Sequence, residues 1–479
     1  MANDCRRSPA NRMIKRLLLF GATGDLAGRF LLPALADLFA EKIVPEDFRV
    51  VGAATRDLDD EEFRKDAAKR LQEHTAADVP ASAREAVVQS LRYRKIDFGN
   101  VASVRAAVEQ TDGGPIAAYL ALPTGVFSAA LKALAAIGLP QGSRIVLEKP
   151  FGEDLESAIA LNKLLKEVTG TAGEQVIFRV DHALGLATVQ NLLALRFANR
   201  VLQPVWNSNH IEQVDILWDE TLALEGRASY YDRAGALKDV IQNHLLQILG
   251  VIAMEPPSSM RGEDLRNAKF DALRSVRVMT PEQAASRSRR ARYTAGRLAN
   301  SGGADGRAVP AYLEEKGVDL KRNTETFAEI LLEIDNPRWS GTRFLLRTGK
   351  ALSQRRKEAV LRFRRLDGQL SDSISPNELR IGLDGPHGVA LHLTGINTGP
   401  PPHLAPLVLE AELPAPKLPA YSRVLMDVLS GASALSVRGD EAEQQWRIVT
   451  PVLEAWADDR VPMQEYRAGS DGPPSLAKP

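Results

Sequence analysis

Short apolar runs alternate with helical stretches over roughly the first 180 residues, and this alternation constrains the fold more than any other feature of the chain. Residues 26–40, for example, carry leucines at helical spacing directly after an apolar run. Strands buried on both faces read as continuous apolar runs, and strands that alternate with helices build a doubly wound parallel sheet. We therefore expect a Rossmann-like dinucleotide-binding domain over residues 14–180, with strands in the runs Lys15–Phe20, Phe48–Ala53, Ala117–Ala121 and Arg144–Leu147.

The pattern changes after about residue 181. Helical stretches near 186–200 and 235–251 are accompanied by strand-like runs separated by turn signals such as DNP, RTG and DGPHG. This pattern predicts an α+β domain over residues 181–466 with a large antiparallel sheet, whose strands fall at His210–Leu217, Ala328–Ile334, Thr342–Arg347, Glu358–Arg364, Leu379–Leu383 and Val389–Leu393.

Three segments show little apolar periodicity. Residues 284–310 are rich in Arg, Ala and Gly, which favours a mobile loop, with a nucleic-acid patch as the weaker alternative. Residues 1–13 are polar and are expected to form a disordered tail, and residues 467–479 a loose C-terminal tail. With 479 residues the chain is too long for one core, so two large domains are expected.

Charge and cysteine content exclude several classes of function. Basic and acidic residues balance at 61 each, which argues against a broad nucleic-acid or membrane surface. The one cysteine, Cys5, cannot form an internal disulfide, and the seven histidines show no metal-ligand spacing, so no metal is expected. No apolar run reaches the roughly 18 residues of a membrane span. These features favour a cytoplasmic enzyme acting on a small molecule.

A glycine-containing turn follows the first strand and is the candidate cofactor loop. Glycines at this junction let the backbone approach a pyrophosphate, and the free amides of the next helix favour its charge. The candidate residues are Gly21, Thr23, Gly24, Asp25 and Leu26. Pro123, after the strand at 117–121, is a further candidate.

The end of the second strand indicates which nicotinamide cofactor is bound. An acidic residue there accepts from a ribose hydroxyl, whereas an arginine pairs with a ribose phosphate. Thr55 and Arg56 favour NADP, and the neighbouring Asp57 leaves NAD open.

Ionisable residues stand where ligands bind in this class of fold. Lys149 directly follows a buried strand, and Asp181 and His182 follow the apolar run IFRV. His244 lies on the apolar stripe of a predicted helix and should face inward.

At these positions the chain resembles the glucose-6-phosphate dehydrogenase family over nearly its whole length. The matching runs are GATGDLA, EKPFG, RVDHALG, TVQNLLALRFAN, YYDRAGALKDVIQNHLLQ, MEPP, LRTGK, PNEL and QQWRIVTPVL. The resemblance implies an NADP-dependent oxidoreductase that converts the anomeric carbon of an aldose to a lactone. It also implies a homodimer or homotetramer assembled through the second domain's sheet.

The resemblance assigns roles to individual residues. His244 matches the general base, and Asp181 matches the carboxylate that orients its imidazole. The residues that match those holding the sugar are Lys149, Glu220, Asp239 and Lys350, and Lys149 also borders the cofactor. Asp239 and His244 would lie about 140° apart on a regular α-helix, so both can face one ligand only near a helix start or on an irregular helix.

Several of the residues that hold the sugar phosphate in this family are replaced in this chain. His182 is retained, but Ala183 and Leu186 replace the usual Tyr and Lys, and Gly28 replaces the Lys after GDLA. A further basic position falls on Gln354, although a one-residue slip would place Arg355 or Arg356 there. Arg355 is the candidate taken into the substrate site.

Two substrate hypotheses therefore remain: glucose 6-phosphate, with Arg355 or Arg356 supplying charge, or an aldose with no phosphate or another substituent. Two further alternatives are the broader sugar dehydrogenase family that oxidises other ring carbons and a non-catalytic regulatory homologue. The long match around QNHLLQ disfavours the first, and retention of His244, Asp181 and Lys149 disfavours the second.

Overall fold

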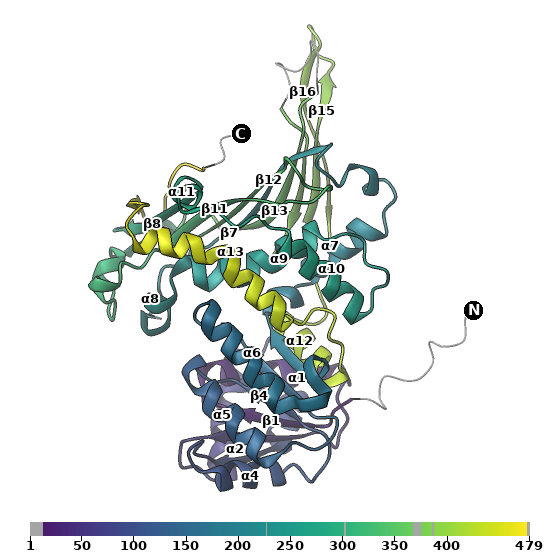
Figure 1. Ribbon diagram of the computed structural model, residues 1–479, viewed down its shortest axis with the longest axis vertical. Helices are drawn as coiled ribbons and strands as arrows, with labels where there is room; N and C mark the ends of the chain where they lie inside the picture. Colours follow the sequence, from purple (N-terminus) through teal and green to yellow (C-terminus); the bar gives the residue numbers. More distant parts are fainter. Residues whose placement is uncertain (1–12, 227, 301–302, 367–374, 386–387, 477–479) are drawn as a thin grey trace, which may run out of the picture. The chain divides into compact units, whose positions relative to one another are not determined.

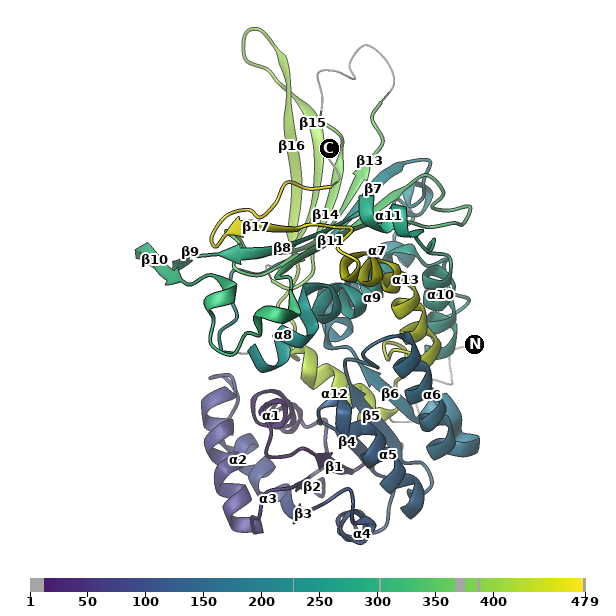
Figure 2. The ribbon, with the colours of Figure 1, turned by 60° about the vertical axis from the view of Figure 1, so that its left-hand side comes forward.

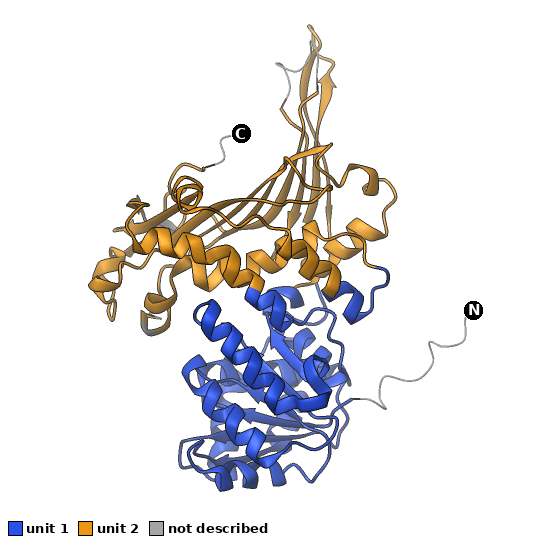
Figure 3. Cartoon of the chain, viewed as in Figure 1, with its two compact units in different colours: residues 1–185, 258–266, 416–443 blue, residues 186–257, 267–415, 444–479 orange. Residues whose placement is uncertain are grey.

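The computed structural model describes residues 13–476 apart from 227, 301–302, 367–374 and 386–387, and the chain forms two compact units (Figures 1 and 3). Unit 1 comprises residues 1–185, 258–266 and 416–443, and unit 2 comprises residues 186–257, 267–415 and 444–479. The first division falls close to the expected boundary at 180, but each unit also takes segments from later in the chain. The tail expected at residues 1–13 lies outside the described residues except for Met13.

Unit 1 is built on a six-stranded parallel sheet, which confirms the expected doubly wound fold. The strand order is β3-β2-β1-β4-β5-β6, so the order reverses between β1 and β4. Most of these strands are apolar because helices cover both faces of the sheet. The strands are β1 (Arg16–Phe20), β2 (Arg49–Ala54), β3 (Leu91–Lys95), β4 (Ala117–Leu120), β5 (Arg144–Glu148) and β6 (Ile177–Val180). The sequence predictions missed β3.

Helices connect the strands of this sheet. Asp59 caps α2 with a capping box, in which its carboxylate accepts from the Glu62 amide at 2.8 Å. The helical elements are η2 (Ala27–Leu31), α1 (Leu32–Ala40), α2 (Asp60–His74), α3 (Ala81–Ser90), α4 (Val101–Glu109), α5 (Thr124–Ile137), α6 (Leu155–Thr169), η3 (Gly170–Val176) and η4 (His182–Gly185).

A segment from the far end of the chain completes unit 1. Helix α12 (Ala420–Ser430) packs its Leu425 and Leu429 into the same core as β1 and α1. The Arg144 guanidinium donates to the carbonyls of Val428 and Leu429 at 2.6 and 2.7 Å, which ties this segment to β5. The unit is therefore not closed by the first 185 residues alone.

Unit 2 is built on a nine-stranded sheet with the order β16-β15-β14-β13-β7-β12-β11-β8-β17. The expected antiparallel sheet is in fact mixed, because the pairs β7–β12 and β8–β17 are parallel. The strands are β7 (Ile211–Asp219), β8 (Ser288–Thr294), β11 (Phe327–Glu333), β12 (Arg343–Gly349), β13 (Arg356–Phe363), β14 (Glu378–Gly382), β15 (Gly388–Asn397), β16 (His403–Glu412) and β17 (Met463–Arg467). A separate hairpin joins β9 (Gly296–Asn300) and β10 (Gly303–Val309).

The longer helices of unit 2 lie on one face of this sheet, as Figures 1 and 2 show. The π-helical segment η6 (Leu237–Leu245) contacts β7, β11 and β12, and it continues directly into α9 (Leu246–Ala253), which packs on α7 (Ala187–Phe197). The remaining helical elements are η5 (Gln203–Val205), α8 (Ala228–Ala236), α10 (Gly262–Arg274), α11 (Pro281–Ser286), η7 (Tyr312–Glu314), η8 (Leu320–Arg322) and α13 (Gly439–Ala457). Within the described residues, none of the helices combines the length and apolarity that a membrane crossing requires.

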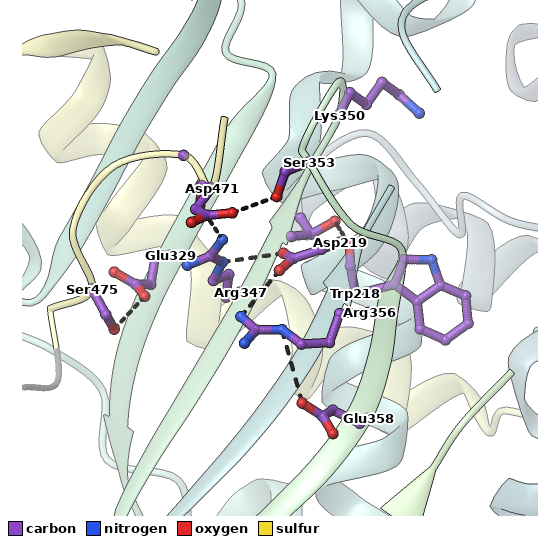
Figure 4. Close-up of polar contacts among 12 residues, drawn as sticks. Trp218, Asp219, Glu329, Arg347, Lys350, Ser353, Arg356, Glu358, Asp471 and Ser475 are labelled. Atoms are coloured by element: carbon purple, nitrogen blue, oxygen red, sulfur yellow. Dashed lines mark hydrogen bonds and ion pairs between the residues drawn. The ribbon is translucent and has the colours of Figure 1, made fainter. Parts of the chain in front are cut away.

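The opposite face of the sheet carries buried charge. Asp219 accepts from Arg347 at 3.1 Å and from Arg356 at 3.2 Å, as Figure 4 shows. Successive side chains of a strand point to opposite faces. Even-numbered residues of β7 such as Trp218 therefore face the helices, and Asp219 faces away from them.

Two expectations about irregular segments were wrong. Most of 284–310 is not a loop but strands β8 to β10, because Ser288, Ala291 and Tyr293 are buried and the Arg290 guanidinium donates to the Val461 carbonyl at 2.9 Å. The described part of the expected loose tail at 467–479 is held against the sheet (Figure 4). There the Ser475 hydroxyl and the amide of residue 476 both donate to the Glu329 carboxylate at 2.8 Å.

Candidate functional site

The candidate cofactor loop follows β1 at the point where the strand order of unit 1 reverses. Gly21 has φ 75°, and a Cβ atom there would lie 2.1 Å from the Ala121 carbonyl oxygen, so a side chain would overlap the backbone. The Gly24 amide donates to the Gly21 carbonyl at 2.8 Å and closes the turn. The structure therefore places the predicted residues Gly21, Thr23 and Gly24 in one tight turn at the edge where ligands bind in this fold, and Asp25 and Leu26 at the start of the helical segment that follows.

Arg70 of α2 braces this loop and was missed by sequence reasoning. Its guanidinium donates to the carbonyls of Gly24 and Thr23 at 2.8 and 3.1 Å and pairs with Asp66 at 3.0 Å. A Cβ atom at Gly28 would lie 2.5 Å from this guanidinium, so Arg70 occupies the space that a longer side chain at position 28 needs. No motif in α2 marks this residue.

The other candidate cofactor residues follow neighbouring strands. Thr55 and Arg56 come directly after β2 and are exposed. The Tyr93 hydroxyl donates to the Arg56 carbonyl at 2.7 Å, and the adjacent Asp57 pairs with Lys95 at 3.0 Å. Pro123 is the N-cap residue of α5, which follows β4. All of these residues share the edge formed by the carboxyl ends of the parallel strands.

Glu148 and Lys149 end β5. Glu148 is buried and accepts a 2.5 Å hydrogen bond from the Tyr119 hydroxyl of β4. Burial raises the pKa of Glu148 to about 7, although the hydrogen bond from Tyr119 and the charge of Lys149 oppose this shift. Burial also raises the pKa of Tyr119 well above its usual value. Tyr119 and Glu148 thus form a buried hydrogen-bonded pair next to Lys149, which directly follows Glu148 in the chain.

Asp181 and His182 follow β6, at the same edge of the sheet at which Lys149 follows β5. Glu148 pairs with Val180 in the strand register, so Lys149 and Asp181 leave neighbouring strands together. Asp181 is 1% exposed and its Oδ1 accepts from the Ala183 amide at 3.0 Å. The His182 ring stacks on Tyr421 of α12, with 5.4 Å between ring centres. Unit 1 thus gathers its predicted cofactor and catalytic residues along one edge.

In unit 2, His244 lies on η6 and is 3% exposed, as its place on the apolar stripe predicted. Its imidazole stacks on the Trp218 indole of β7, with 5.8 Å between ring centres. Because η6 has π-helical winding, a residue lies about one turn from the residue five positions before it. Asp239 and His244 are five positions apart, so both project from the same side and the expected geometric conflict disappears.

Glu325 fixes the start of η6. Its carboxylate accepts from the Leu237 amide at 2.9 Å, and burial raises its pKa to about 7. The preceding Gly235 has φ 68° and ψ 176°, a conformation that is essentially restricted to glycine. A Cβ atom at this position would also overlap the Glu325 carboxylate. Sequence reasoning missed Glu325 because it belongs to no motif.

Glu220 and Lys350 form an ion pair on the helix-facing side of the sheet. The Lys350 ammonium lies 2.6 Å from Glu220 Oε2 and 4.9 Å from the centre of the Tyr231 ring, and Lys350 is labelled in Figure 4. Burial alone would raise the pKa of Glu220, but the charges of Lys350 and Lys357 outweigh it and the pKa is lowered. The carboxylate is therefore held in its charged form beside two cations.

The structure distinguishes between the arginines after the LRTGK run. Arg356 faces the far side of the sheet and pairs with Asp219 at 3.2 Å (Figure 4). Arg355 instead pairs with Asp384 at 2.7 Å, together with Lys357 at 2.9 Å. Lys357 lies on the helix-facing side, because its ammonium is 4.1 Å from the Trp218 ring centre. Unit 2 thus places Arg355, rather than Arg356, beside Lys357 on the helix-facing side of the sheet.

The comparisons with known families and structures agree with one another. "Glucose-6-phosphate dehydrogenase, NAD binding domain" matches residues 18–191, and "Glucose-6-phosphate dehydrogenase, C-terminal domain" matches residues 193–478. The glucose-6-phosphate 1-dehydrogenase of Rhizobium meliloti is 39% identical, with 95% of this chain and 94% of the relative covered. That of Treponema pallidum is 37% identical, with 95% and 92% covered.

Two solved structures share this fold over almost the whole chain. One is a glucose-6-phosphate dehydrogenase in complex with its substrate glucose-6-phosphate, which has a TM-score of 0.86 at 28% identity and 96% coverage of each chain. The other is the glucose-6-phosphate 1-dehydrogenase of Mycobacterium avium, with a TM-score of 0.81 at 30% identity, covering 96% of this chain and 95% of the other.

Proposed function

Because the chain belongs to the glucose-6-phosphate dehydrogenase family, we propose that it oxidises the anomeric carbon of glucose 6-phosphate or a closely related hexose to a lactone. The observation that carries this proposal is the buried His244 of unit 2, whose imidazole stacks on Trp218 on the face of the sheet that also carries the ion pair of Glu220 and Lys350. A lone core histidine would not need such a charged neighbourhood.

The proposed chemistry divides between proton and hydride transfer. His244 accepts the proton of the anomeric hydroxyl while the anomeric carbon loses hydride, and the carbon becomes the carbonyl carbon of the lactone. The nicotinamide cofactor supplies the hydride acceptor when it is bound. Asp181 is the proposed carboxylate partner of the imidazole, which would fix its tautomer and stabilise its charged form. Asp239, Glu220, Lys350, Lys149 and His182 are proposed to hold the sugar.

We propose NADP as the preferred cofactor. The tight turn that begins at Gly21 lets the backbone approach a pyrophosphate closely, and Arg56 after β2 supplies a cation for a ribose phosphate. The neighbouring Asp57 is paired with Lys95, which reduces its competition for a ribose hydroxyl. Comparing the initial rates with NADP and NAD at matched concentrations tests this choice.

A sugar without phosphate is the second candidate substrate. Ala183 is buried and Leu186 carries no charge, so the start of α7 offers no cation to a phosphate. The purified chain should be assayed with glucose 6-phosphate, glucose, galactose and glucosamine, and the product identified as lactone or ketose. Preference for glucose 6-phosphate with a lactone product supports the main proposal. A ketose product, or no cofactor reduction with any sugar, would refute it.

We also propose that the chain assembles as a homodimer or homotetramer in the cytoplasm. The long β15–β16 hairpin at the edge of the sheet exposes Leu407 and Leu409, which lie on one face of the hairpin and form a surface suited to a second copy. The single cysteine fits a reducing compartment. Sedimentation of the purified protein at several concentrations measures the assembly, and a monomer at all of them would contradict it.

A further inference from the structure

The turn at residues 350–353, which follows β12, has a strained backbone. Ala351 has φ 52°, in the left-handed region that residues with a Cβ atom rarely adopt. Ala351 and Leu352 are also buried, at 0% and 2% exposed. Such a conformation persists only where the surrounding contacts determine it, and it occurs most often at ligand-binding sites. The contacts that hold this turn therefore bear on the function of Lys350, its first residue.

The turn is hydrogen-bonded to the segment that follows β7. The Leu352 amide donates to the Glu220 carbonyl at 3.0 Å, and the Ala351 amide donates to the Leu222 carbonyl at 2.9 Å. The Lys350 ammonium lies 2.6 Å from the Glu220 carboxylate. The position of the turn therefore sets where the two members of this ion pair meet.

Tyr466 of β17 holds the carbonyl of Lys350. Its hydroxyl donates to this carbonyl at 2.7 Å and forms a second hydrogen bond, of 2.9 Å, with the Thr326 hydroxyl. Burial raises the pKa of Tyr466, so its hydroxyl stays protonated and can donate. The Lys350 amide in turn donates to the Thr326 carbonyl at 2.9 Å. The peptide groups on both sides of the Lys350 Cα atom are thus fixed.

The residues directly after β17 bind the rest of the turn. The Gly469 amide donates to the Ala351 carbonyl and the Ser353 amide donates to the Ser470 carbonyl, both at 2.8 Å. The Ser353 hydroxyl also donates to the Asp471 carboxylate, as Figure 4 shows. These partners lie more than a hundred positions from the turn in the sequence, so no local motif marks them.

We propose that Tyr466 is a positioning residue for the sugar, because it holds the strained turn at 350–353 and thereby directs the Lys350 side chain. The inference rests on the proposed function, in which Lys350 holds the sugar. The stem of a lysine is flexible, and fixing its backbone lowers the entropy that is lost when the ammonium binds a ligand. Tyr466 acts through Lys350 and does not itself contact the sugar.

Steady-state kinetics of Tyr466→Phe test this role, with the sugar of the proposed panel that the native chain oxidises fastest. Loss of one hydrogen bond should raise the KM for that sugar about 3- to 10-fold, whereas the KM for the nicotinamide cofactor should change less than about twofold. The kcat should fall less than the KM rises, because Lys350 is proposed to hold the sugar both before and during the reaction. Tyr293→Phe is the matched control, because it removes the hydroxyl of another buried tyrosine, which donates to Glu315 at 3.0 Å.

Two double variants separate positioning from a general loss of structure. In a Lys350→Gln background, Tyr466→Phe should raise the KM for the sugar no further, because the group that it positions is gone. Ala351→Gly should restore much of the KM in Tyr466→Phe, because glycine adopts a positive φ without being held there. The proposal is overturned by an unchanged KM in Tyr466→Phe, by a full further rise in the Lys350→Gln background, by no recovery with Ala351→Gly, or by an equal rise in Tyr293→Phe.

Hydrogen exchange distinguishes failure of this proposal from failure of the proposed function. Peptides that cover residues 350–353 should exchange about 10-fold faster in Tyr466→Phe than in the native chain or Tyr293→Phe, whether or not a sugar binds. Faster exchange in a chain that oxidises no sugar would defeat the proposed function and leave the hold of Tyr466 on the turn established. Unchanged exchange would overturn that hold. Thermal melting confirms that each variant is folded.

Discussion

Replacement of Glu325 by Gln should change how the stability of the protein depends on pH. Glu325 is buried, and its pKa is raised from 4.5 to about 7 because burial disfavours the charged carboxylate. The Leu237 amide and the charges of Arg290 and Lys238 favour the charged form, but burial outweighs them. Glutamine keeps the shape of the side chain and an acceptor for the Leu237 amide, but it does not titrate.

The sign of the effect follows from the direction of the shift. A folded-state pKa above the unfolded value means that the folded protein holds the proton more tightly. The contribution of the Glu325 carboxyl to the free energy of unfolding is therefore fully present below about pH 4.5 and is lost as the pH rises through about 7. The difference between 4.5 and about 7 corresponds to about 3 kcal/mol of unfolding free energy. Most of this loss, about 2–3 kcal/mol, falls between about pH 5 and pH 8.

Urea unfolding of the native chain and Glu325→Gln over this pH range measures the effect. The stability of the variant relative to the native chain should rise by about 2–3 kcal/mol from about pH 5 to pH 8. Glu454→Gln, an exposed position on α13, controls for removal of one carboxylate and should show no such trend. If the difference between native chain and Glu325→Gln is constant over this range, the carboxyl does not hold a proton in the folded state and the argument fails.

Three further changes test other parts of the structure. His244→Asn should lower kcat about 10²- to 10⁴-fold in the sugar assay, and near-normal turnover would remove the imidazole from the mechanism. Arg70→Ala should weaken NADPH binding about 10-fold, because it removes the hydrogen bonds to the two loop carbonyls. An unchanged NADPH affinity in a fluorescence titration would exclude a role of Arg70 in holding the loop for the cofactor. Gly235→Ala should destabilise the protein by about 1–3 kcal/mol or more in urea, exceeding Gly113→Ala, whose φ is also positive but whose Cβ meets no atom. Equal costs at the two glycines would show that the Glu325 carboxylate moves aside.

The sequence predicted the parallel sheet of unit 1 and the place of its ligand-binding edge. The run from Leu17 to Phe20 is buried and apolar because helices cover both faces of the sheet, so the strand is visible in the sequence. Gly21 was identifiable for a similar reason, since only glycine fits its backbone conformation and the nearby Ala121 carbonyl. The assigned roles of Asp181 and His244 stay predictions.

The sequence was less informative where charged side chains form a sheet. The stretch SRRARYT of β8 lacks an apolar pattern because its arginines are satisfied by partners distant in the chain, such as the Val461 carbonyl for Arg290. For the same reason the sequence did not predict that the last described residues lie against the sheet, because hydrogen bonds to the distant Glu329 carboxylate hold them there. Local periodicity cannot report a hydrogen bond to a residue more than a hundred positions away.

Sequence alone therefore determined the family, the parallel sheet of unit 1 and the residue types available for chemistry, because these depend on local apolar patterns and short motifs. Only the tertiary structure decided which side chains share a face. It placed Arg355 rather than Arg356 on the side of His244, and its π-helical winding brought Asp239 and His244 to one side of η6. Strand register and helix winding fix such directions, and both are set by packing against distant parts of the chain.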